Sequence, residues 1–172
     1  MLSTINSSIR YKLLLAVLSA CVLVAIALGV ALNSLSSIST SFSRFIEEDQ
    51  AKLEAFMAMY AQGLQGGQAL RNIVLNPSDK KAVSNLEKSY KDFDDAFQIA
   101  SKISLSDPVW KAMLADIAQK WRVTLDARQR VLNLAATNQA DTIKLLNDDE
   151  TPAWRLTREL LTSTVAELKK AS

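Results

Sequence analysis

Residues 13–32, LLLAVLSACVLVAIALGVAL, form an uncharged run that decides how this chain is organised. Twenty helical residues at about 1.5 Å each cover about 30 Å, the thickness of the hydrocarbon core of a bilayer. The run therefore predicts a transmembrane helix. Arg10 and Lys12 precede it, and the next basic residue after it is Arg44. By the positive-inside rule, we expect residues 1–12 in the cytoplasm and everything after the run outside it.

A cleaved signal peptide is the alternative for this segment, because signal peptides share the basic start and the apolar stretch. The apolar region of a signal peptide normally runs about 7–15 residues before a small-residue cleavage site, and this run is longer. Residues 25–27 (AIA) and 29–31 (GVA) could each be read as a weak cleavage site. The helical pattern continues past the run without a break, which favours a retained anchor.

The composition indicates long helices and excludes several classes of function. The chain has only 4 Gly and 3 Pro in 172 residues, and it has no histidine. Its only cysteine, Cys21, lies inside the apolar run, so His-based catalysis, Cys/His metal sites and disulfides are excluded. A net charge of +2 spread along the chain gives no basic block for nucleic acid. We therefore expect no catalytic residues, no cofactor, no metal site and no nucleic-acid partner: the chain is not an enzyme.

The first two helices outside the membrane are predicted from apolar spacing and from their ends. Apolar residues step by three and four from Ile38 to Val74, as on one face of a long helix. Residues 76–79 (NPSD) should end that helix, because proline disfavours helix at the preceding residue and suits the first position of the next one. The second helix is expected from about Ser78 to Ile103.

Two further proline signals predict the remaining helices. Residues 106–108 (SDP) should cap and start a third helix, which continues less regularly to Leu146. Residues 147–152 read as a third turn, with Thr151 as the cap and Pro152 as the first residue of a fourth helix.

Four helices joined by short turns must alternate in direction. The expected fold is all-α: an N-terminal transmembrane helix, residues 13–32, followed by an up-down-up-down antiparallel four-helix bundle over residues 33–172. In this reading the first helix of the bundle extends much further than the fourth. We therefore expect the given sequence to be truncated in its fourth helix, with a second membrane segment beyond it.

Two stretches carry a resemblance to a known family. Residues 68–77 (QALRNIVLNP) in the first helix and residues 151–155 (TPAWR) resemble the four-helix-bundle sensor modules of bacterial methyl-accepting chemotaxis proteins. The resemblance covers the whole chain. It implies an inner-membrane homodimer whose periplasmic bundle binds a small molecule, often an organic or amino acid. Binding would be relayed by a small displacement of the fourth helix into a second membrane helix.

Two alternatives to the chemoreceptor remain open. The same sensor bundle also precedes histidine kinases and cyclic-dinucleotide enzymes, which would keep the input and change the output. A membrane-anchored scaffold that binds no ligand is the alternative from another class of function.

An inward-facing arginine is the first candidate for ligand binding. Arg128 falls on the apolar face of the third helix, where a charge is costly unless it is paired. Thr124 lies one turn before it on the same face. A guanidinium with a hydroxyl beside it suits a small carboxylate ligand. The structural alternative is that Arg128 snorkels or pairs with Asp94 or Asp95.

Three further arginines form the second candidate. Arg71 lies near the membrane-distal end of the first helix, and Arg155 and Arg158 lie near the expected start of the fourth, at about the same height. In the related aspartate receptor, arginines in this part of the first helix hold the ligand carboxylate across the dimer interface. The alternative is a solvated surface, with the acidic residues 148–150 nearby.

A small-residue face of the first helix is the last feature of interest. Gly63 and Gly67 lie four residues apart and would let another helix approach closely. Packing is the simpler reading, and room for a ligand is the functional one.

Overall fold

The computed structural model describes residues 2–103 and 107–171. It separates into two units, residues 2–44 and residues 45–171, which we describe one at a time. The first unit is a single helix, α1 (Leu2–Arg44). Within the described residues there is one helix long and apolar enough to cross a membrane, and its most apolar stretch is entirely unburied.

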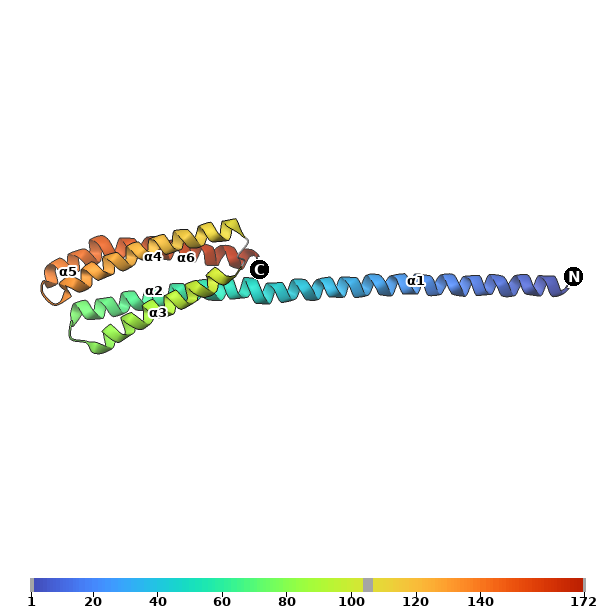
Figure 1. The fold of residues 1–172 in the computed structure, drawn as a ribbon, viewed down its shortest axis with the longest axis horizontal. Helices are drawn as coiled ribbons and strands as arrows, with labels where there is room; N and C mark the ends of the chain where they lie inside the picture. The colour runs from blue at the N-terminus through green and yellow to red at the C-terminus, as the bar shows by residue number, and fades with distance from the viewer. Residues whose placement is uncertain (1, 104–106, 172) are drawn as a thin grey trace. The chain divides into compact units, whose positions relative to one another are not determined.

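The second unit is an antiparallel bundle of four helical runs (Figure 1). The first run comprises the π-helix η1 (Phe45–Gln50) and α2 (Ala51–Leu75). The second is α3 (Lys80–Lys102), and the third is α4 (Pro108–Ala135). The fourth comprises α5 (Gln139–Leu145), the π-helix η2 (Leu146–Glu150) and α6 (Thr151–Ala171). The all-α, four-helix-bundle prediction is confirmed.

Side-chain caps place two of the helix starts. The Asp79 carboxylate accepts hydrogen bonds from the amides of Lys81 and Ala82, so α3 begins after Asp79. The predicted start at about Ser78 was therefore two residues early. The Asp107 carboxylate caps α4 in the same way, with Pro108 as the first helical residue as predicted. Ser106, the other residue of that predicted cap, lies outside the described residues.

The predicted third turn is wrong. The chain turns at residues 136–138, where the Asn138 side chain accepts the Asp141 amide and caps α5. Residues 147–152 are helical instead of a turn. Pro152 does not start the fourth helix, which begins at Gln139. The helix can continue through Pro152 because the turn before it is a π-turn. A proline has no amide hydrogen to donate, and in an ordinary α-turn its ring would clash with the carbonyl four residues back. The wider turn relieves that clash.

The core of the bundle has two apolar clusters. One contains Phe56, Phe93, Trp110, Trp121 and Trp154, and Phe93 stacks on Trp121 with ring centroids 3.9 Å apart. The other is aliphatic and lies toward the far ends of α2 and α4 (Ala69, Leu70, Ile73, Val74, Ala82, Leu86, Val131, Ala135 and Leu146). Burying a charged group in such an interior is costly unless it is paired. Arg128 and Glu150 are nevertheless fully buried in this bundle.

Candidate functional site

Arg128 is fully buried in the interior of the bundle. Its position on α4 puts it on the same face as Thr124 and Val131, which are also buried. The guanidinium Nε donates a hydrogen bond of 2.9 Å to Oε1 of Glu150, and the two side chains form an ion pair with no solvent exposure. Nη2 donates a second bond of 3.0 Å to the carbonyl oxygen of Gly63. Arg128 therefore connects α4 with α2 and with η2.

Aromatic rings surround the same guanidinium. Its central carbon lies 5.3 Å from the ring centroid of Trp121, 5.6 Å from that of Trp154 and 5.9 Å from that of Tyr90. Ring faces attract a cation, more strongly when water is excluded. The rings therefore offset part of the cost of burying Arg128.

Glycines on α2 make room for these large side chains. A Cβ added to Gly63 would lie 2.1 Å from Cη2 of Trp154, and one added to Gly66 would lie 2.5 Å from Nη1 of Arg128. Both distances are far below van der Waals contact. Gly63, one of the two glycines of the predicted small-residue face, is thus used for packing inside the bundle, and Gly66 rather than Gly67 makes the second close approach.

Two polar atoms at this site have no hydrogen-bond partner among the described residues: Nη1 of Arg128 and the hydroxyl of Tyr90. Burial raises the pKa of Tyr90, and the positive charge of Arg128 opposes that rise without cancelling it. Leaving a buried donor unbonded costs about 1–3 kcal/mol. The polar network around Arg128 is therefore only partly satisfied.

Thr124 faces the fourth helical run. Its hydroxyl oxygen lies 2.9 Å from that of Thr157 on α6, and both residues are fully buried. It also donates to the carbonyl of Lys120. Thr124 thus joins α4 to α6 one turn away from the Arg128–Glu150 pair.

The remaining candidate arginines lie on the surface. Arg71 is exposed on α2 and donates from Nη1 to the carbonyl of Gly67, 3.0 Å away. Arg155 is exposed and Arg158 is half-buried, both on α6. Among the described residues, no hydrogen bond or ion pair connects Arg155 or Arg158 to Arg71.

Arg71 is not level with Arg155 and Arg158, contrary to the sequence prediction. Trp154, next to Arg155, packs on Gly63. Arg71 lies eight residues beyond Gly63, which is about 12 Å further along α2. The prediction placed the start of the fourth helix at residue 152, and the true start at residue 139 moves both α6 arginines to the middle of the run.

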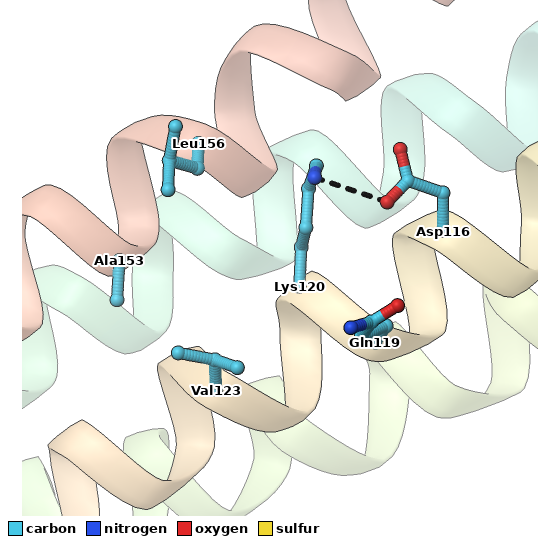
Figure 2. Close-up of a pocket in the computed structure, with 6 residues that line it drawn as sticks. All are labelled: Asp116, Gln119, Lys120, Val123, Ala153 and Leu156. Atoms are coloured by element: carbon cyan, nitrogen blue, oxygen red, sulfur yellow. Dashed lines mark ion pairs between the residues drawn. The ribbon is translucent and has the colours of Figure 1, made fainter.

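An open groove of about 210 Å³ lies between α4 and α6. Figure 2 shows Lys120 and Asp116 of α4 at one end, joined by an ion pair of 3.0 Å, and Ala153 and Leu156 of α6 across from them. Val123 lines the groove further along α4. Its walls are mostly apolar with a charged edge, so a small amphipathic molecule fits its chemistry. Lys120 is a cation that the sequence reasoning did not single out.

The sequence reasoning also missed the partner of Arg128. It named Asp94 and Asp95, but both are exposed on α3, and Asp95 pairs with Lys91. Glu150 was assigned to a solvated turn. Its spacing in the sequence could have indicated that it faces inward. Glu150 lies four residues after Leu146 and four before Trp154, and both of these residues are buried.

The described residues contain no group of three or more Cys, Asp or Glu side chains placed to hold a metal ion. What the site offers chemically is a buried charge pair, a groove with a charged edge, and surface guanidinium groups. Guanidinium groups suit carboxylate and phosphate oxygens, which they can bond through two parallel N–H donors.

Comparison with known families gives a match over nearly the whole chain. Residues 6–171 match the family described as a four helix bundle sensory module for signal transduction. Neither a search of curated proteins nor a search of solved structures gave a match. The matched range includes both α1 and the bundle, in agreement with the resemblance noted in the sequence.

Proposed function

Because this chain belongs to the family of four-helix-bundle sensory modules for signal transduction, we propose that it is the ligand-sensing part of a bacterial chemoreceptor. The main support for the proposal is the family match over residues 6–171, because it includes both the apolar helix and the bundle. In this proposal α1 anchors the protein in the inner membrane, with residues 1–12 in the cytoplasm and the bundle in the periplasm. The position of Arg10 and Lys12 before the apolar run supports that orientation.

The proposed ligand is a small carboxylate, such as an organic acid or an amino acid. Arg71 and Arg155 are exposed, and neither has an acidic partner among the described residues, so both can take a carboxylate from solvent. Arg158 is the half-buried third member of the set. Arg128 and Thr124 are candidates only for a ligand that enters the bundle, since both are fully buried.

We propose that binding is relayed by displacement of the fourth helical run. Arg128 and Thr124 both bond to this run, so a change in either contact changes how α6 is held. A histidine kinase or a cyclic-dinucleotide enzyme could receive the same movement.

A ligand-free scaffold is the second candidate function. One observation favours it: Arg128 already has an acidic partner inside the bundle. A scaffold needs that pair for its fold and needs no ligand.

A thermal-shift screen of organic acids, aromatic acids and amino acids on the full chain in detergent tests the proposal. Binding to the folded state alone stabilises it by RT ln(1 + [L]/Kd), about 2.7 kcal/mol at a ligand concentration of 100 Kd. We expect at least one acid to raise Tm by several degrees, and its uncharged amide to leave Tm unchanged. If no acid raises Tm, the scaffold reading replaces the sensor.

We also propose a homodimer, supported by an exposed stripe on α2. Exposed residues on α2 recur at steps of four and three, the spacing of a coiled-coil face: Met57, Ala61, Leu64, Gln68, Arg71 and Leu75. On α1 every described side chain from Tyr11 to Ser43 is exposed, so exposure marks no single face. If α1 pairs in parallel, residues seven apart would form one seam: Leu14, Cys21, Leu28, Leu35 and Phe42. A second copy of the chain, paired in parallel, would cover the stripe on α2.

Cys21 gives a direct test of the dimer. In a parallel pair the two Cys21 side chains would face each other across the seam, within reach of a disulfide. We expect oxidation of membranes with copper phenanthroline to give a reducible dimer. The matched control carries Cys21→Ala with Ile26→Cys, which puts the thiol on the opposite side of α1. Equal cross-linking of the two, or none of either, would argue against this pairing.

A further inference from the structure

Another groove, of about 200 Å³, lies between α3 and α4. Aromatic rings from both helices line it: Phe93 and Phe97 from α3 and Trp121 from α4. Phe93 and Trp121 stack with an interplanar angle of 14°, and both side chains are buried. Their stack fixes which parts of the two antiparallel helices lie opposite each other.

Two opposite charges stand beside that stack, one on each wall of the groove. Asp94 follows Phe93 on α3. Arg122 follows Trp121 on α4, so the two charges lie at about the same height. Both side chains are exposed, and no side-chain hydrogen bond or ion pair joins either of them to another described residue. Each can therefore take a group of opposite charge from solvent.

The groove has room beside these charges because a small residue lies opposite a ring. Phe97 lies about one turn beyond Phe93 on α3. Ala118 lies about one turn before Trp121 on α4, which puts it level with Phe97. Its methyl group leaves space beside the half-buried Phe97 ring. Pockets for drug-sized ligands measure about 300–1,000 Å³, so this smaller groove suits a molecule with a single ring.

We propose that this groove binds a small zwitterion that carries an aromatic ring, as an aromatic amino acid does. The ligand carboxylate bonds to the Arg122 guanidinium, and the ligand ammonium group bonds to the Asp94 carboxylate. The ring lies over Ala118, against Phe97 and Trp121. A simple acid would put a second negative charge in the groove beside Asp94, so the ligand that pairs both walls carries both charges.

This site goes beyond the proposed function. The surface arginines proposed above take a carboxylate alone and lie on α2 and α6, neither of which lines the groove. The groove also requires a positive charge on its ligand. Trp121 connects it to the interior of the bundle, because the ring lies 5.3 Å from the guanidinium carbon of Arg128.

Calorimetric titration of the full chain in detergent tests the groove with phenylalanine and two analogues that each lack one charge. Phenylpropionate has no ammonium group, and phenylethylamine has no carboxylate. We expect phenylalanine to bind about threefold to tenfold more tightly than either analogue. Arg122→Gln should weaken binding of phenylalanine and phenylpropionate and leave phenylethylamine unchanged. Asp94→Asn should weaken binding of phenylalanine and phenylethylamine and leave phenylpropionate unchanged.

Ala118→Leu tests the location without changing a charge. The larger side chain fills the space beside Phe97, so phenylalanine should bind about tenfold more weakly or worse. Tm of the free protein should stay unchanged, since Ala118 is exposed. Ala112→Leu is the matched control: Ala112 is also exposed on α4 but does not line the groove, and this variant should bind phenylalanine as the parent does.

Failure of phenylalanine to bind overturns the site. Equal binding of phenylalanine and phenylpropionate, or equal losses in the two leucine variants, also overturns it. An acid that raises Tm in the screen and keeps its affinity in Arg122→Gln supports the proposed function without this groove, so the two proposals can fail separately.

Discussion

Replacing Arg128 by methionine is expected to lower the free energy of unfolding of the bundle by about 3–5 kcal/mol. The side chain is fully buried, and its loss leaves Glu150 as a buried carboxylate with no cation beside it. The Gly63 carbonyl also loses its bond from Nη2. These costs exceed the gain from removing the unbonded Nη1.

Urea unfolding followed by tryptophan fluorescence measures this loss, because all three tryptophans lie in the bundle. Adding Glu150→Leu should recover most of the stability, since replacing both members of a buried pair is often neutral or stabilising. Arg130→Met is the matched control: Arg130 pairs with Asp149 on the exposed surface and should change stability by less than about 1 kcal/mol. If Arg128→Met and Arg130→Met cost the same, the buried pair does not hold the bundle together.

Gly63→Ala is expected to destabilise the bundle by about 3 kcal/mol, although alanine is the better helix former by about 1 kcal/mol. The new methyl group would lie 2.1 Å from Cη2 and 2.3 Å from Cζ3 of Trp154. The indole ring is rigid and buried, so it cannot turn aside at low cost. Steric overlap therefore outweighs helix propensity.

A double-mutant cycle with Trp154→Ala identifies the cause of that loss. In the Trp154→Ala background the methyl group has space, so Gly63→Ala should cost little or become favourable. The same cost in both backgrounds would show that the methyl group meets something other than Trp154.

The fold was largely predictable because the signals are local. The run at residues 13–32 is long enough for a membrane span, and the Asp107–Pro108 cap starts α4 as expected. Pro152 misled the reasoning, because a proline after acidic residues looks the same before a new helix and after a π-turn. The Asn138 cap carried the correct signal for the third turn.

The interior of the site was only half predictable. Periodicity placed Arg128 and Thr124 on the buried face of α4, and the structure confirms their burial. Glu150 was missed because residues 147–152 were read as a turn, so its spacing of four from Leu146 and from Trp154 was not used. The predicted position of Arg155 and Arg158 along the bundle was wrong because the fourth helical run was predicted to begin at Pro152, and it begins at Gln139.

The most direct test of the proposed sensor function is calorimetric titration of the full chain with the acid that raises Tm most. A charge-assisted arginine contact contributes on the order of 1.5–3 kcal/mol. Alanine at the contacting residue among Arg71, Arg155 and Arg158 should therefore weaken binding by about tenfold to a hundredfold with Tm of the free protein unchanged. Lys120→Ala tests the groove between α4 and α6 as the binding location: a loss of affinity in this variant alone would place the ligand there instead of at the arginines. Unchanged affinity in all three arginine variants would contradict the account.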